Sequence, residues 1–313
     1  MDAVRAAASR IAGRVDATPV LTSATLDGEV GAHVLAKDEA LQKTGSFKVR
    51  GALNRLLTLP DEKVARGLVT VSAGNHAAAL AWAASQVGAK ATVVMPLHAP
   101  AAKVAACHGY GAEVVLHGDS TAEAFAESKR LRDERGLTFV HPFDDPEIVA
   151  GQGTSALELV AEVGPVDVWV VPVGGGGLTC GTALVVREAN PACRVVAVEP
   201  EGAAALSAAI AAGRPVPIVP HSVADGLCAP RAGDLTFPLF RRLVDEVVTL
   251  GEEEILAGVL FVMERMKAVV EPAGAAGVAA LLAGRVGGVA GGRVGTILSG
   301  GNLDLRTVVP LLP

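Results

Sequence analysis

The sequence predicts an α/β protein in which mostly parallel sheets are covered by helices on both faces. Short apolar runs rich in valine lack polar alternation, so we interpret them as strands that are buried on both faces. Most of these runs are followed by an alanine-rich run of helical character, as expected for units that join parallel strands. The length of 313 residues suits two domains, and an apolar fraction of 50% allows a large core.

The predicted elements begin with an amphipathic helix at the N-terminus, where Val4, Ile11 and Val15 fall on one side. A second helical run follows Lys48, and strands and helices then alternate from residue 67 onward. The apolar runs predict strands at residues 67–71, 91–96, 112–118, 138–143, 166–173, 193–200, 246–250 and 294–298. The segments between them predict helices, including 120–136, 146–163, 202–212 and 251–266.

Charge and hydropathy indicate a protein that acts on small molecules. The net charge is −6 and no basic patch occurs, so we expect neither a nucleic-acid nor a membrane partner. The most apolar stretch, residues 268–284, is interrupted by Glu271 and Pro272 and cannot provide a spanning helix. Arginines interrupt the N-terminal segment, which therefore lacks the apolar part of a signal peptide. We expect a cytoplasmic protein whose four cysteines are bystander thiols, because their spacing fits no metal site.

Three turns that combine glycine with small polar residues follow predicted strands. They are "SAGNH" (72–76), "GGGG" (174–177) and "SGGN" (299–302). Ligands of open α/β sheets bind at the carboxyl ends of the strands, where these turns would lie. Four glycines before a helix leave backbone N–H groups free for a phosphate, although a dinucleotide site or a plain tight turn are alternatives. For Ser72 the alternative is a helix N-cap, and His76 by itself suits a structural role.

Lys48 follows Phe47 in "KTGSFKVRGA" (43–52), and it is either a surface residue or an amine with a chemical task. A free lysine amine has a pKa near 10.4, so holding it neutral at pH 7 costs about 4.6 kcal/mol. A lysine that is joined to an aldehyde cofactor as an imine avoids this cost. Together with a phosphate turn, such a lysine points to pyridoxal 5′-phosphate (PLP).

Five motifs, in this order, carry a resemblance to one enzyme family. They are "KTGSFKVRGALN", "SAGNHAAAL", "VVPVGGGGL", "MERMKAVVEPAGAAGVAAL" and "LSGGN", and the similarity covers nearly all of the chain from residue 18. The chain resembles the fold-type II PLP enzymes (tryptophan synthase β-like), in the branch of threonine/serine dehydratases, or ammonia-lyases, and serine racemase. This resemblance implies a homodimer. It also implies a large PLP-binding domain of residues 1–66 and 144–313, and a small mobile domain of residues 67–143 that closes over substrate.

The resemblance implies a role for each matching residue. Lys48 would carry the cofactor and move the substrate Cα proton, and Phe47 would pack against the cofactor ring. Asn75 would bond to the 3′ oxygen of the ring, and Glu271 would line its other face. Ser299 would face the ring nitrogen, and a neutral serine there suits β-elimination. The phosphate would be bound by Gly174, Gly175, Gly176, Gly177 and Leu178. The substrate carboxylate would be bound by the turn of Ser72, Ala73, Gly74, Asn75 and His76.

The implied reaction is β-elimination of the hydroxyl of a small β-hydroxy amino acid, such as L-threonine or L-serine, to give a 2-oxo acid and ammonia. Racemisation and the dehydration of 3-hydroxyaspartate or a bulkier β-hydroxy amino acid are alternatives. A PLP-binding protein without turnover is the non-enzyme alternative. Similar serine racemases read "SSGNH", and their second serine serves the face of the substrate opposite the lysine. Here Ala73 occupies that position, so elimination is expected to exceed racemisation.

The resemblance also raises the question of effectors. Racemase-like members bind a divalent cation, and Glu199 and the Ala203 carbonyl match two of its ligands. Ala205 stands where a second carboxylate is expected, so we expect the site to be weakened or absent. Lys43 and Lys267 match positions near a nucleotide effector site, which is too little to predict nucleotide control. No isoleucine-binding domain follows Asn302, so we expect no inhibition by isoleucine.

Overall fold

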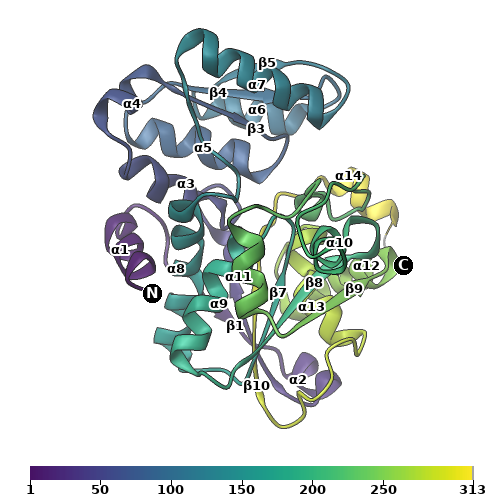
Figure 1. Ribbon diagram of the computed structural model, residues 1–313. Coiled ribbons are helices and arrows are strands. Elements are labelled where there is room, and N and C mark those ends of the chain that lie inside the picture. Colours follow the sequence, from purple (N-terminus) through teal and green to yellow (C-terminus); the bar gives the residue numbers. More distant parts are fainter. Residues whose placement is uncertain (312–313) are drawn as a thin grey trace.

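The computed structural model describes residues 1–311, which form a smaller and a larger lobe, each built on one sheet (Figure 1). The sheet of the smaller lobe has four parallel strands in the order β5-β4-β3-β6. These strands are β3 (Leu68–Val71), β4 (Ala91–Met95), β5 (Glu113–Leu116) and β6 (Thr138–Phe139). All four fall within residues 67–143, while the domain boundaries themselves stay a prediction.

The sheet of the larger lobe has six strands in the order β1-β2-β10-β7-β8-β9. They are β1 (Val20–Leu21), β2 (His33–Asp38), β7 (Val168–Pro172), β8 (Arg194–Pro200), β9 (Glu246–Leu250) and β10 (Arg293–Leu298). The short β1 is antiparallel to β2, and the other pairs are parallel. The predicted α/β class with mostly parallel sheets is therefore confirmed.

Strands β1 and β2 were not predicted, because the apolar runs that indicate strands begin only at residue 67. The run of β2 ends in Lys37 and Asp38, and charged residues hide a buried strand from a search for apolar runs. In the fold both side chains are buried, and the Lys37 amine lies 2.9 Å from a carboxylate oxygen of Glu158. A partner that is distant in sequence therefore makes this buried charge tolerable.

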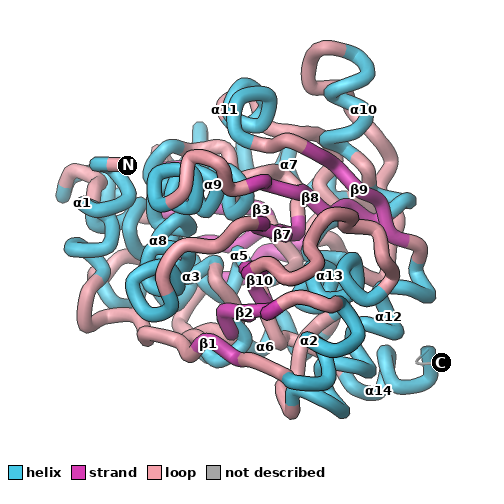
Figure 2. The backbone as a smooth tube through the Cα atoms, turned by 90° about the horizontal axis from the view of Figure 1, so that it is seen from below, coloured by secondary structure: helices cyan, strands magenta, loops and turns pink. Residues whose placement is uncertain are grey.

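Helices cover both faces of the large sheet, as the view in Figure 2 shows. One face is covered by α1 (Asp2–Ile11), α8 (Pro146–Val163) and α9 (Gly177–Ala189). The other face is covered by α2 (Ala24–Val30), α12 (Glu252–Phe261) and α13 (Pro272–Leu282). Further helices of this lobe are α10 (Ala205–Ala212), α11 (Thr236–Leu243) and α14 (Leu305–Val308), and α12 continues into a π-helical turn, η4 (Val262–Met266).

The small sheet is covered by α5 (Asn75–Gln86) and α6 (Ala101–Gly109) on one face and by α7 (Thr121–Arg135) on the other. The remaining helices near this lobe are α3 (Lys48–Leu57) and α4 (Asp61–Arg66). Helix α3 packs on both α5 and α8, so it lies between the two lobes (Figure 1). Within residues 1–311, no helix combines the length and apolar character needed to cross a bilayer.

Local sequence explains where α8 begins, directly after the chain returns from the small sheet. The Asp145 carboxylate accepts hydrogen bonds from the N–H groups of Glu147 (2.8 Å) and Ile148 (3.4 Å), which the first turn leaves unpaired. Pro146 at the first helical position has no N–H to satisfy. This firm start holds the preceding residues 141–144 close to the cavity described below.

Candidate active site

A cavity of about 360 Å³ lies between the two lobes, at the carboxyl ends of β3, β7 and β10. The turns after β3 (residues 72–76) and after β7 (residues 174–177) both line it, and so does Ser299 after β10. Lys48 enters the same cavity from the start of α3. Three segments that are far apart in sequence and one lysine therefore share one space, as expected for ligand sites of open parallel sheets.

The Lys48 side chain is half-buried, and its amine donates a hydrogen bond to the Pro142 carbonyl at 3.0 Å. Burial lowers the pKa of Lys48 to about 8, although the nearby Glu271 carboxylate acts in the opposite direction. At a pKa of about 8, roughly one amine in ten is neutral at pH 7, so the neutral form costs only about 1.4 kcal/mol. The position thus activates this amine for reaction with an aldehyde.

The turn of residues 174–177 offers backbone N–H groups instead of side chains. Helix α9 begins at Gly177, and Gly176 precedes it with a φ of +102°, which favours glycine. Within residues 1–311, nothing accepts a hydrogen bond from the N–H groups of Gly174 to Leu178. Buried N–H groups are nearly always paired, so this row at a helix N-terminus fits an anion such as a phosphate.

Packing around this turn leaves no room for side chains. A Cβ atom on Gly175 would lie 2.3 Å from carbon atoms of the Phe143 ring. One on Gly176 would lie 2.4 Å from the Phe240 ring. Two aromatic rings thus require glycine at residues 175 and 176.

The turn of residues 72–76 presents a second set of N–H groups. The Ser72 hydroxyl accepts a hydrogen bond from the Gly74 N–H at 3.1 Å, and α5 begins at Asn75. In the described part of the chain, the N–H groups of Ala73, Asn75 and His76 make no hydrogen bond. This arrangement fits the carboxylate of a substrate.

The His76 ring is buried, and its Nε2 atom lies 3.3 Å from the Val140 carbonyl oxygen. Burial, reinforced by the neighbouring Lys48 amine, lowers the pKa of His76 to about 3. The ring is therefore neutral at pH 7 and bound to the backbone of the small lobe, which agrees with a structural role.

Asn75 connects the two lobes through its side-chain amide. Its Nδ2 atom donates to a Glu271 carboxylate oxygen at 2.5 Å, and its Oδ1 atom accepts from Asn302 at 2.8 Å. Burial, followed by the charge of Asp225, raises the pKa of Glu271 to about 7. One N–H of the Asn75 amide is not used by Glu271, so it stays available for the 3′ oxygen that the resemblance assigns to this residue.

Ser299 and Phe47 lie side by side at the base of the cavity. The Ser299 side chain is buried, with its hydroxyl 3.4 Å from the Ala273 carbonyl oxygen. Its own carbonyl accepts a hydrogen bond from the Phe47 N–H at 3.1 Å, which ties the end of β10 to the residue before Lys48. The Phe47 ring centroid lies 5.2 Å from the Lys48 amine.

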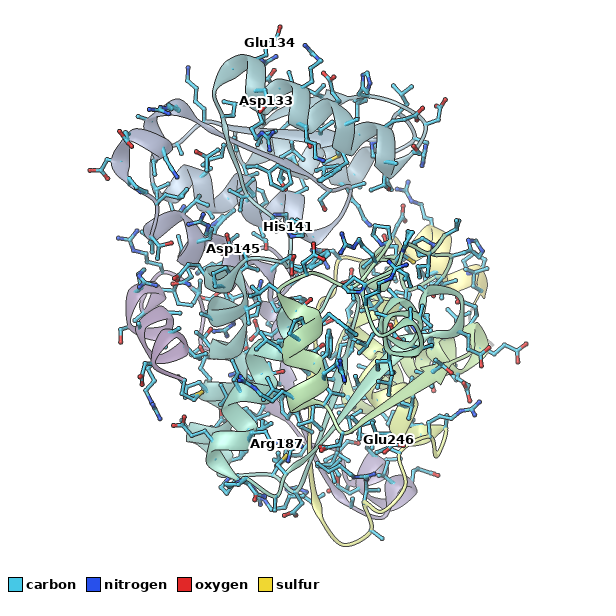
Figure 3. All side chains as sticks on the ribbon, in the orientation of Figure 1. Asp133, Glu134, His141, Asp145, Arg187 and Glu246 are labelled. Carbon is cyan, nitrogen blue, oxygen red and sulfur yellow. The ribbon has the colours of Figure 1, made fainter. Side chains whose placement is uncertain are left out.

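Residues 141–144, which link the small sheet to α8, were not predicted to belong to the site. Figure 3 places His141 at this junction, close to Asp145 at the start of α8. Pro142 and Phe143 contact Lys48 and the glycine turn, as described above. The run "TFVHPF" predicts only a strand. Its position directly before a capped helix was the feature that could have indicated a role in the site.

At the rim of the cavity, Lys103 of α6 forms an ion pair with Asp225 of the large lobe.

Glu199, the weak candidate for a metal ligand, is occupied by protein donors. Its carboxylate accepts from the N–H groups of Leu206 (2.6 Å) and Ser207 (2.9 Å) and from the Ser207 hydroxyl (2.7 Å). The Glu199 carboxylate therefore caps the N-terminus of α10, and Ala203 lies in the preceding 3₁₀ turn. The described residues contain no group of three or more His, Cys, Asp or Glu side chains that could hold a metal ion.

The residues that converge here fit PLP. The activated amine of Lys48 suits the aldehyde of this cofactor, and the unpaired N–H groups of the glycine turn suit its phosphate. Both sets line the same cavity, which also contains the buried hydroxyl of Ser299 and the Phe47 ring.

Comparison with known proteins leads to the same group. Residues 11–300 match the family described as pyridoxal-phosphate dependent enzyme. An L-threonine ammonia-lyase of Geobacter sulfurreducens is 44% identical over 306 residues, which cover 97% of this chain and 76% of that protein. An L-threo-3-hydroxyaspartate ammonia-lyase of Saccharomyces cerevisiae is 41% identical over 307 residues, which cover 98% and 94%. The structure of maize serine racemase superposes with a TM-score of 0.94 at 40% identity, covering 99% of this chain and 95% of that one.

The family match spans most of the chain, and the relatives cover nearly all of it at about 40% identity. The chain belongs to the family of pyridoxal-phosphate dependent enzymes, and PLP is its cofactor.

Proposed function

We propose that this enzyme is an ammonia-lyase that removes the β-hydroxyl group of L-threonine or L-serine, with a 2-oxo acid and ammonia as final products. The observation that carries the proposal is the pairing of one activated amine, Lys48, with an alanine at residue 73. The cavity thus has a proton-transfer group on one face of the substrate, and Ala73 supplies none for the other. Relatives named L-threonine ammonia-lyase support this choice.

When bound, PLP withdraws electrons from the substrate Cα and makes its proton acidic. Lys48 is proposed to take this proton on Nζ, because its lowered pKa keeps part of the amine neutral at pH 7. The N–H groups of the 72–76 turn are proposed to orient the substrate carboxylate, and those of residues 174–178 to hold the phosphate. The Ser299 hydroxyl is proposed to face the ring nitrogen without imposing a charge on it.

The charge of the cavity favours threonine and serine over 3-hydroxyaspartate. Five consecutive residues line the cavity and have no role in the assignments above, so we propose that they contact the substrate side chain. They are Gly226, Leu227, Cys228, Ala229 and Pro230. Among the described residues that line the cavity, Lys103 is the cation besides Lys48, and it is already paired with Asp225. A second substrate carboxylate would therefore meet mostly apolar groups and the charge of Asp225, which is unfavourable.

The test is a substrate panel of L-threonine, L-serine, L-threo-3-hydroxyaspartate and a bulkier β-hydroxy amino acid, with 2-oxo acid formation as the measurement. We expect kcat/KM for threonine or serine to exceed that for 3-hydroxyaspartate by about tenfold or more. A preference for 3-hydroxyaspartate would establish the other ammonia-lyase activity that relatives carry. A protein that binds PLP but turns over none of these compounds would support the non-enzyme alternative.

Replacing Ala73 with serine is expected to increase racemisation. The variant Ala73→Ser places a hydroxyl in the proposed carboxylate turn, where it could donate a proton to the face opposite Lys48. A positioned acid or base contributes about 10²–10⁴-fold, so we expect the ratio of D-serine to pyruvate formed from L-serine to rise by about tenfold or more. Chiral analysis of the remaining serine during turnover measures this ratio.

The matched control is Ala126→Ser on the exposed side of α7, which should leave the ratio unchanged. If the wild-type enzyme already forms D-serine as fast as pyruvate, another residue or a water supplies the second proton. The assignment as an ammonia-lyase rather than a racemase would then be wrong.

We further propose a cytoplasmic homodimer with a large domain of residues 1–66 and 144–313 and a small domain of residues 67–143. Exposed apolar side chains support association, including Leu41, Val269, Leu305 and Val309. Each of the two lobes is built on its own sheet, which supports a boundary near residues 67 and 143. All four cysteines are free thiols, as expected in a reducing compartment.

A further inference from the structure

The carbonyl of Gly175, in the glycine turn, is fixed from the side opposite the cavity. It accepts a hydrogen bond from the Thr236 hydroxyl at 2.7 Å. Thr236 is fully buried and does not line the cavity, whereas Gly175 and Gly176 do. The peptide between the two glycines is trans, so its carbonyl and the Gly176 N–H point in opposite directions. The bond to Thr236 therefore directs the Gly176 N–H toward the cavity.

Thr236 is in turn held by Asp144. One carboxylate oxygen of Asp144 accepts from the N–H groups of Leu235 (2.9 Å) and Thr236 (3.1 Å), and the other accepts from the Asp234 N–H (2.9 Å). These donors lie at the start of α11, where a helix leaves N–H groups unpaired and favours a negative charge. Asp144 thus fixes the backbone that carries the Thr236 side chain.

The orientation of the Thr236 hydroxyl is also determined. Its oxygen accepts a hydrogen bond from the Gly233 N–H at 3.1 Å, so its hydrogen is free to point at the Gly175 carbonyl. A Cβ atom on Gly233 would lie 2.0 Å from a carboxylate oxygen of Asp144. The loop before α11 can therefore approach Asp144 this closely only with a glycine at this position.

We propose that Thr236 and Asp144 are positioning residues for the cofactor phosphate. Thr236 orients the Gly175–Gly176 peptide so that an N–H group faces the phosphate, and Asp144 holds Thr236 in place. Neither side chain touches the phosphate itself. The proposal rests on the assignment of residues 174–178 to the phosphate, which the Gly175→Val variant described in the Discussion tests separately.

The experiment compares PLP with pyridoxal, which lacks the phosphate, in titrations of the apo-enzyme. Thr236→Val keeps the shape of the side chain and removes the hydroxyl. We expect it to weaken PLP about three- to tenfold, as for the loss of one hydrogen bond, and to change pyridoxal affinity less than twofold. Thr236→Ser restores the hydroxyl and should return PLP affinity to the wild-type value. The ³¹P resonance of bound PLP should shift in Thr236→Val and not in Thr236→Ser.

Two further variants separate positioning from a general loss of stability. Thr296→Val removes a buried hydroxyl that donates to the Val170 carbonyl at 2.8 Å, within the large sheet and away from the glycine turn. It should lower the melting temperature and leave the ratio of PLP to pyridoxal affinity unchanged. Asp144→Ala should weaken PLP selectively, and its effect should not add to that of Thr236→Val in the double variant, because Asp144 acts through Thr236.

The proposal is overturned if Thr236→Val binds PLP within twofold of the wild-type enzyme. It is also overturned if PLP and pyridoxal weaken equally, or if Thr236→Ser fails to restore PLP affinity. If Gly175→Val loses PLP while Thr236→Val does not, the phosphate assignment stands and only the positioning role is wrong. None of these measurements depends on which amino acid is the substrate.

Discussion

Lys48→Ala is expected to abolish both the formation of 2-oxo acid and the visible absorbance of protein-bound PLP. The variant removes the amine that is proposed to join the cofactor and to accept the Cα proton. Loss of a positioned base alone is worth about 10²–10⁴-fold in rate, and loss of the covalent link adds to it, so activity should fall at least 10⁴-fold. Single-turnover assays with L-threonine and an absorbance spectrum of the PLP-treated variant measure the two effects.

The structure supplies a control for this variant. Lys63 is an exposed lysine on α4, and Lys63→Ala should retain the spectrum and the rate of the wild-type enzyme. Circular dichroism of Lys48→Ala should match the wild type, because the amine makes one hydrogen bond, to the Pro142 carbonyl, among the described residues. A variant that keeps both the absorbance band and full activity would exclude Lys48 as the cofactor lysine.

Gly175→Val is expected to weaken PLP binding by about 100-fold or more. Its Cβ atom would lie 2.3 Å from carbon atoms of the Phe143 ring, far inside contact distance. Either the ring or the turn must move, and the N–H groups of residues 174–178 then no longer converge on one point. A phosphate held by several such groups loses most of them together, and titration of the apo-enzyme with PLP measures the loss.

Gly28→Val is the matched control, because Gly28 is exposed on α2 and an added Cβ atom meets nothing within 4 Å. It should bind PLP like the wild-type enzyme. Thermal unfolding of both apo-variants shows whether Gly175→Val is folded, and the smaller Gly175→Ala should give an intermediate loss. If folded Gly175→Val bound PLP as tightly as the wild type, the phosphate would lie elsewhere, and the role proposed for Thr236 would fall with it.

Local patterns in the sequence were sufficient to predict much of the architecture. Apolar runs such as residues 166–173 and 294–298 became buried parallel strands, since a strand covered on both faces needs no polar alternation. The helix predicted at residues 146–163 occurs with the same bounds, because Asp145 and Pro146 mark its start locally. The strand β2 was missed because the partner that allows Lys37 to be buried comes from another part of the chain.

The sequence likewise indicated some features of the candidate site, and contacts in the folded chain determined the others. The glycine run and the lysine were visible as residue types with a chemical purpose, and their convergence could be expected from the rule that parallel strands end at one edge. The similarity of Glu199 to a metal ligand was visible too, but its carboxylate is used by the backbone and hydroxyl groups of α10. A residue type alone does not indicate whether its hydrogen-bonding capacity is already satisfied.

The sequence by itself determined the fold class, the family resemblance and the identity of the groups that can react, because these depend on residue type and on order along the chain. Only the tertiary structure decided how these groups are tuned and held. Burial of the Lys48 amine lowers its pKa to about 8. Thr236, which lies 61 residues after Gly175, bonds to the glycine turn, and Asp144, which lies 31 residues before Gly175, holds Thr236. Both effects depend on which atoms surround a group in space, and contacts between such distant segments exist only after the chain has folded.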